Sequence, residues 1–247
     1  MRIITKAVFA LLLLSGVSTH SQAQFKDLVN DAQKAAGNIG NNGGKPSESE
    51  IGDGLRQALK IGAKNATGKV SATNGFFKDA LIKVLMPPEA KKVENTLRSV
   101  GMGDQVDKLI LSMNRGAEDA STKALDIFVD AITHMTIQDA LSILNGGNDA
   151  ATQYLKKTTS VALTNAFKPV IKQSLDKVHA TEYWATVFDT YNKMPTTFKK
   201  VNPDLPAYVT ERALNGVFVY IAQEEAKIRK DPAAQVTDLL KKVFGSH

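Results

Sequence analysis

The side chains best suited to chemistry lie around residues 114–130. Amide, guanidinium and carboxylate groups follow one another there, and Lys172 and Asp176 come later in the chain. Acid–base catalysis and metal binding both use such groups when they converge in a cleft. The sequence therefore indicates one candidate polar cluster, composed of Asn114, Arg115, Glu118, Asp126, Asp130, Lys172 and Asp176.

Three interpretations of this polar cluster stay open. Glu118 follows Arg115 by three residues, so the two can form an ion pair along one helix. Asp126 and Asp130 lie four residues apart with like charge, which costs about a few tenths of a kcal/mol unless a cation lies between them. The spacing favours a solvated helix face first. A buried network with Arg115 and Lys172 that fixes helix packing comes second, and a catalytic or metal site third.

Other catalytic and metal-binding patterns are absent from the sequence. It has no cysteine and four histidines, of which His20 and His247 lie near the two ends. No HExxH motif, no histidine pair with ligand spacing and no G-x-S-x-G motif is present. His134 and His179 are expected at helix ends, where the helix dipole favours them. We predict no metal and no cofactor, assign no catalytic residue, and favour a binding role over an enzymatic one.

A glycine-rich turn at residues 145–149 is a second candidate site. Gly146 and Gly147 allow close backbone approach, and the helix that follows presents free amides to an anion. Asp149 is expected to occupy those amides as the N-cap. A turn with its cap is the favoured interpretation, and the alternative is an anion or ligand site formed by Gly146, Gly147, Asp149 and Thr152.

Aromatic residues gather in a third candidate site, at residues 183–191. Their spacings of one, four and three place several of them on one side of a helix. A core stripe is the favoured use. The alternative is an apolar pocket for a lipid-like ligand, lined by Tyr183, Trp184, Phe188 and Tyr191.

Helical periodicity runs through the chain, and no stretch alternates apolar and polar residues as a strand would. The longest predicted helix spans about 104–134, with Asp104 as its N-cap and an apolar stripe from Val106 to Ile132. Gly116 inside it indicates a close helix crossing or a kink. Further helices are predicted at 25–36, 76–86, 136–144, 149–178, 181–194 and 206–230, and another begins at a capping box at Ser47. Pro169 should kink or interrupt the helix at 149–178.

A last helix is predicted from Asp231, where an N-cap precedes Pro232. Apolar residues at helical spacing follow, so this helix should dock onto the core. The predicted fold is all-α: an irregular multi-helix bundle with one long central helix (about 104–134) and a docked C-terminal helix.

The N-terminus has the parts of a signal peptide. Arg2 and Lys6 precede the apolar stretch 7–17, and residues 21–23 end in a small-x-small cleavage pattern. We predict a signal peptide at 1–23, a short helix and flexible Gly/Asn linker at 24–46, and a single helical domain at 47–247. The protein is then exported, periplasmic or secreted, and the mature chain has no transmembrane span.

Export and charge limit the class of partner. Removal of Arg2 and Lys6 lowers the formal net charge from +6 to +4, and charges of both signs are interleaved along the chain. Nucleic-acid binding has little support in this pattern. With no cysteine, neither a lipoprotein anchor nor a disulfide is available.

Several motifs together resemble a family of uncharacterised exported bacterial proteins, a domain of unknown function. They are LSMNR at 111–115, FVDAI at 128–132, ILNGG at 143–147 with DAATQY at 149–154, FKPVIKQS at 167–174, and DLLKKVFG at 238–245. The likeness covers about residues 47–245. It implies export and helical structure, and it supplies no activity.

Three functions follow, in the order in which the sequence favours them. The first is non-enzymatic binding of an apolar, lipid-like ligand or a protein partner in the cell envelope. The second is an enzyme that uses the polar cluster. The third is a structural or adhesive surface component, with the Gly/Asn linker as a spacer.

Overall fold

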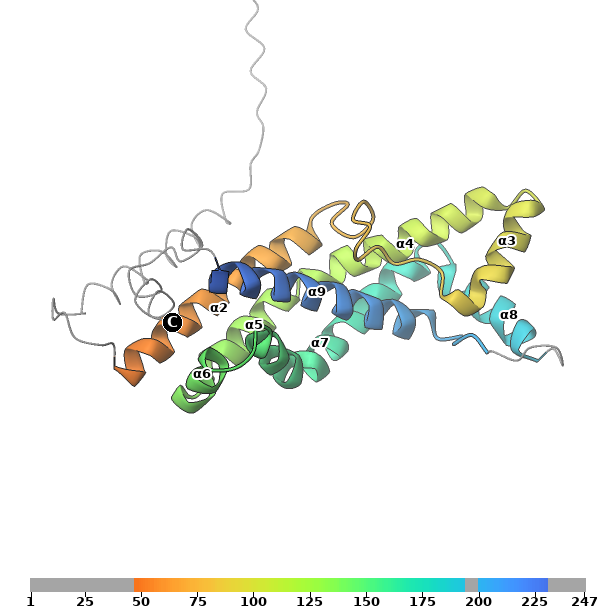
Figure 1. Cartoon of the computed structure of the whole chain (residues 1–247). Coiled ribbons are helices and arrows are strands. Elements are labelled where there is room, and N and C mark those ends of the chain that lie inside the picture. Colours follow the sequence, from red (N-terminus) through yellow and green to blue (C-terminus); the bar gives the residue numbers. More distant parts are fainter. Residues whose placement is uncertain (1–46, 194–199, 231–247) are drawn as a thin grey trace, which may run out of the picture. The chain divides into compact units, whose positions relative to one another are not determined.

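The computed structural model describes residues 47–193 and 200–230, and in this part of the chain every regular element is a helix. The predicted signal peptide, the helix at 25–36, the Gly/Asn linker and the last helix from Asp231 lie outside the described residues. The elements are α2 (Glu48–Ser71), the 3-10 helix η1 (Pro88–Ala90), α3 (Lys91–Ser99), α4 (Gly103–Ser121), α5 (Ala124–Thr133), α6 (Ile137–Leu144), α7 (Ala150–Asp176), α8 (Ala180–Asn192) and α9 (Leu205–Lys230) (Figure 1). The all-α fold is therefore confirmed.

Two helices begin with the capping boxes that the sequence contains. Ser47 Oγ accepts the backbone amide of Glu50, whose carboxylate accepts the amide of Ser47 in return. Thr136 and Asp139 make the same reciprocal pair at the start of α6. Each pair satisfies two amides that a helix start would otherwise leave without a partner.

The long central helix is present as α4 and α5, with a bend after Ser121. The amides of Thr122 and Lys123 bond to carbonyls three residues back, which tightens the chain between the two parts. The predicted stripe is buried from Val106 through Phe128 to Ile132. Asp104 is not the N-cap as predicted, because α4 begins at Gly103 after Met102, and Asp104 stands in the first turn.

The stripe of α4 and α5 packs against α2, α7 and α9, and these helices supply most of the core (Figure 1). Gly116 lies where α4 crosses α7. A Cβ at this position would lie 3.5 Å from the Cβ of Ser174 and 3.6 Å from the Cα of Ile171. The close crossing predicted from this glycine is confirmed, because a larger residue would push the two helices apart.

Helix α7 continues through Pro169 without the predicted interruption. Pro169 is exposed, so the carbonyl that its missing amide leaves unpaired lies on the solvent side of the helix. The buried residues of α7, among them Leu163, Phe167 and Ile171, lie on the opposite face and keep the helix against the core.

Residues 72–87, between α2 and η1, are not helical, so the predicted helix at 76–86 is wrong. Asn74, with φ at 69°, and Gly75 turn the chain away from the end of α2. A Cβ on Gly75 would lie 2.5 Å from the carbonyl oxygen of Lys69. After the turn, Ile82, Val84 and Met86 are buried at every second position, as in an extended chain.

Among the described residues no single helix is long and apolar enough to cross a membrane. Gly103–Thr133 and Ile137–Leu144, which meet at a bend of 105°, reach the required length and composition only when taken together.

Candidate functional site

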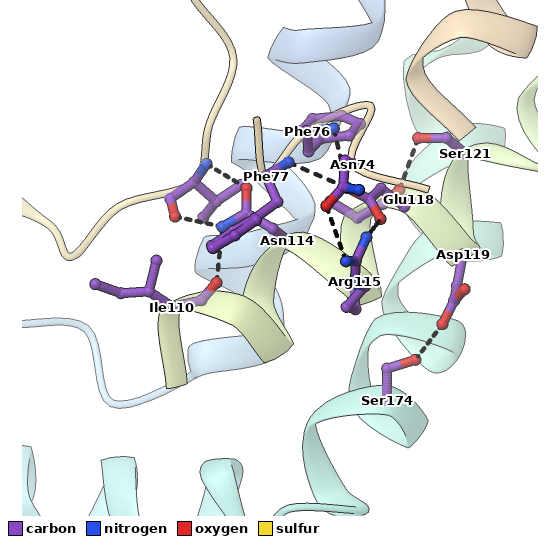
Figure 2. A network of polar contacts seen from close by, with 12 residues as sticks. Asn74, Phe76, Phe77, Ile110, Asn114, Arg115, Glu118, Asp119, Ser121 and Ser174 are labelled. Atoms are coloured by element: carbon purple, nitrogen blue, oxygen red, sulfur yellow. Dashed lines mark hydrogen bonds and ion pairs between the residues drawn. The ribbon is translucent and has the colours of Figure 1, made fainter. Parts of the chain in front are cut away.

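A polar network on α4 holds the irregular segment 72–87 in place (Figure 2). Asn114 is fully buried in the first half of this network. Its Oδ1 accepts the amide of Val84 at 2.8 Å, and its Nδ2 donates to the carbonyl of Val84 at 2.8 Å and to that of Ile110 at 2.7 Å. The side chain thus pairs with Val84 as a neighbouring strand would, which explains how this extended segment stays buried without a sheet.

Glu118, one turn further along α4, forms the second half. Its Oε1 accepts the amides of Phe76 and Phe77, each at 3.1 Å, and its Oε2 accepts Arg115. Arg115 also donates to Asn74 Oδ1 at 2.9 Å. Figure 2 shows Asn74, Arg115 and Glu118 facing one another beneath the turn. The buried carboxylate is thereby paired with a cation and two amides.

The other members of the predicted polar cluster lie elsewhere. Asp126 and Asp130 are exposed on α5, and Asp130 lies 3.3 Å from the imidazole of His134. Lys172 and Asp176 form an exposed pair on α7, where the hydrogen bond from Lys172 lowers the pKa of Asp176. The structure therefore brings together three of the seven residues, Asn114, Arg115 and Glu118.

The chemistry open to these three residues is limited, because their polar atoms are occupied by the chain itself. Both side-chain atoms of Asn114 and both carboxylate oxygens of Glu118 have protein partners. In the described ranges no group of three or more His, Cys, Asp or Glu residues could hold a metal ion. The geometry fits the second interpretation of the cluster, a buried network that fixes packing.

The glycine-rich turn leads into α7 as expected, but its cap comes from a distant residue. Asp149 makes no side-chain cap hydrogen bond. The amides of Ala151 and Thr152 instead donate to the buried carboxylate of Glu225 on α9, at 3.0 and 2.8 Å. The Thr152 hydroxyl also donates to Glu225, which is paired with Arg229 at 2.9 Å. The expected role of Asp149 is therefore wrong, and an anion would have to displace Glu225 to reach these amides.

An apolar groove of about 770 Å³ lies along α4, between α3 on one side and α8 with the end of α7 on the other. Three of the four predicted pocket residues line it, namely Tyr183, Trp184 and Phe188, whereas Tyr191 does not. The facing walls are apolar and come from Met86, Val93, Leu97, Met102, Val106 and Leu109.

The turn from α7 to α8 sets the direction of one wall of this groove. His179 takes a left-handed conformation, with φ at 56°, and reverses the chain after α7. Trp184 and Phe188 then pack at 4.3 Å between ring centroids, and the Trp184 indole donates to the carbonyl of Asn202 at 2.9 Å. The aromatic side chains are thus at once core residues and the floor of the groove, which combines the two interpretations of the aromatic stretch.

Helix α3 forms the opposite wall. Arg98 donates to Asp107 on α4 at 2.8 Å and to Glu94 on its own helix at 3.0 Å. Burial of Glu94 raises its pKa, but hydrogen bonds from Lys91 and Arg98 outweigh this and lower the pKa below its usual value. The wall is therefore fixed by charged groups on its outer side, which leaves Val93 and Leu97 facing the groove.

Sequence reasoning did not identify Glu225 or the contribution of α3 to the groove. Glu225 follows Glu224 in a helix with charged neighbours, and no local pattern distinguishes it from a solvated carboxylate. One signal for the groove does exist: Val100 and Met102 are large apolar residues in the short connection between α3 and α4, where polar residues are usual.

Comparison with known proteins places the chain in a family. Residues 45–245 match the family described as "Protein of unknown function (DUF4197)", and the chain belongs to it. No curated protein and no solved structure matches the chain.

Proposed function

Because the family to which the chain belongs has no known function, we propose from the groove itself that this protein binds an apolar, lipid-like ligand without catalysing its conversion. The proposal places the protein in the cell envelope or outside the cell, as the predicted signal peptide implies. The observation that carries it is the apolar groove between α3, α4 and α8.

Exposed apolar side chains around the groove support the proposal. Nine large apolar residues are exposed in the described part of the chain, and four of them line the groove: Met102, Val178, Tyr183 and Val187. Contiguous exposed apolar surface of this kind marks binding sites, because leaving it in water is unfavourable. The volume also falls within the range of about 300–1,000 Å³ that small-molecule sites occupy.

The polar network supports binding over catalysis. The groups that a reaction would need at this face, on Asn114 and Glu118, are bonded to the segment 72–87. Arg115 lines the groove but is held by Glu118 and Asn74.

Trp184 provides the assay, because it is the single tryptophan of the chain and it lines the groove. Titration with uncharged alkyl glucosides of 8, 10 and 12 carbons, below their micelle concentrations, should shift its fluorescence. Each methylene buried contributes about 0.8 kcal/mol, so two more carbons should tighten binding roughly tenfold.

A matched pair of variants locates the binding. Val187 lies in the groove and is 39% exposed, whereas Val161 on α7 lies outside it and is 75% exposed. Val187→Asp should abolish the fluorescence shift and Val161→Asp should leave it unchanged. If the fluorescence titration of the wild-type protein gives the same affinity for the alkyl glucosides of 8, 10 and 12 carbons, the proposed function is refuted.

A further inference from the structure

Positively charged residues outnumber negatively charged ones along the groove. Its lining includes three cations, Lys108, Arg115 and Lys177, and one carboxylate, Asp119. Arg115 is paired with Glu118, and Asp119 accepts the hydroxyl of Ser174 at 3.0 Å. Within the described ranges neither Lys108 nor Lys177 has an ion-pair partner, although Asp104 lies one turn before Lys108. The lining thus has a net positive charge, because three cations face one carboxylate, Asp119, which accepts a hydroxyl and has no ion-pair partner among the described residues.

Polar residues line the groove along α4, at Gln105, Lys108 and Ser112, and again where α4 crosses the end of α7. Asp119, Ser174 and Lys177 meet there, beside Gly116. The apolar lining from Met102 and Val106 lies toward the start of α4, next to Leu97 of α3. From position 102 to position 119 the helix rises by about 25 Å. The end of the groove at this crossing therefore holds Lys177 and Asp119, and the longer part along α4 has mostly apolar walls with Lys108 among them.

We infer that the ligand is a single-chain amphiphile with an anionic head group, a carboxylate or a phosphate, and that Lys177 receives the head while the chain lies along α4 toward α3. This inference rests on the proposed function. Lys177 supplies the donor at the α7 end of the groove, because the hydroxyl of Ser174 already donates to Asp119, and Lys108 adds positive potential along the rim. Asp119 at the same end attracts a cation and opposes an anion, so the preference for an anionic head rests on the excess of cations along the whole lining.

Four twelve-carbon compounds test this selection, with Trp184 fluorescence as the readout: laurate, dodecyl phosphate, uncharged 1-monolaurin and cationic dodecyltrimethylammonium. The anionic compounds should bind about tenfold more tightly than monolaurin, which corresponds to ~1.4 kcal/mol. The cationic compound should bind most weakly, and added salt should reduce the anionic preference. The ratio between laurate and dodecyl phosphate distinguishes a carboxylate head from a phosphate head.

Lysine variants locate the head group. Lys177→Gln should remove most of the anionic preference, measured as the ratio of laurate affinity to monolaurin affinity, and the double variant with Lys108→Gln should remove the rest. Lys156 on the first half of α7 is exposed and lies outside the groove, so Lys156→Gln is the matched control and should behave as wild type.

The outcomes separate this inference from the proposed function. Equal binding of all four compounds, or a full anionic preference in Lys177→Gln, overturns the inference and leaves the proposed function standing. Failure of all four to bind overturns both. Dimerisation by light scattering that is lost in Val187→Asp, without amphiphile binding, would assign the groove to a second copy of the chain and would also overturn both.

Discussion

Replacement of Asn114 by alanine tests the claim that the polar network holds the segment 72–87. The side chain is fully buried and forms hydrogen bonds with both backbone groups of Val84. Alanine fits the space, but it leaves the buried amide and carbonyl of Val84 without a hydrogen bond. The carbonyl of Ile110 keeps its backbone hydrogen bond within α4 and loses only the additional donor from the Asn114 side chain.

The cost can be estimated from these two groups. A buried donor or acceptor left unsatisfied costs about 1–3 kcal/mol, so the two groups of Val84 together cost roughly 2–6 kcal/mol. A protein of this kind has a total stability of about 5–15 kcal/mol. With a urea dependence of about 2 kcal/mol per molar, a loss of about 3 kcal/mol lowers the unfolding midpoint by roughly 1.5 M.

Urea unfolding followed by circular dichroism gives this free energy, and hydrogen exchange shows where the structure opens. Amides of residues 76–86 should lose protection first in Asn114→Ala. Asn145→Ala is the matched control, because Asn145 is exposed and donates only to the carbonyl of Leu141 in its own helix. A loss below about 1 kcal/mol in Asn114→Ala, or a loss equal to that of the control, would refute the assigned role.

Two further predictions concern helix starts. Glu225→Ala should lower the free energy of unfolding in urea by about 3–5 kcal/mol, because two amides and Arg229 lose a buried partner. Asp149→Ala should lower it by less than about 0.5 kcal/mol. The opposite ranking of the two variants would contradict the assigned cap. Hydrogen bonds from the side chain and then the backbone of Thr136 lower the pKa of Asp139. The ionised carboxylate therefore stabilises the folded protein above the ordinary pKa of about 4, and this stabilisation is lost as the pH falls through the lowered pKa of the folded state. Thr136→Ala should therefore destabilise by about 1 kcal/mol at pH 7, and its difference from wild type should narrow toward pH 3; a difference that stays constant with pH would contradict this coupling.

The sequence allowed prediction of those features that depend on neighbours within a few residues. The capping box at Ser47 needs only a partner three positions away, and the stripe on α4 and α5 needs only helical spacing. Gly116 marks the crossing with α7 because a glycine inside a helix is unfavourable unless another backbone lies close.

Two of the errors, the helix at 76–86 and the cap at Asp149, have a common physical cause: the deciding hydrogen bonds come from far along the chain. Residues 76–86 have apolar residues that a helix could use, but Asn114 and Glu118 satisfy the backbone groups of this segment in an extended form. The start of α7 has a local cap candidate in Asp149, but Glu225 reaches the same amides from α9. Neither long-range partner leaves a local pattern in the sequence.

The same long-range bonds explain why the groove stays open. Closing α8 onto α3 would bury Met102, Tyr183 and Val187, which the hydrophobic effect favours. Each wall is instead tied to a different part of the core. Before α3, Val84 is fixed to α4 by Asn114, and Arg98 ties α3 itself to Asp107.

The wall formed by α8 is anchored from the other side. Trp184 donates to Asn202 and stacks on Tyr208 of α9, while Asn192 pairs with both backbone groups of Val201. Moving the α8 wall inward would break partly buried hydrogen bonds, at a cost of about 1–3 kcal/mol for each group left without a partner, which is comparable with the gain from burying one large apolar side chain. Asn114, one of the polar residues that first suggested catalysis, therefore helps to hold the chain that leads into one wall, and the proposed ligand would supply the burial that the chain itself forgoes.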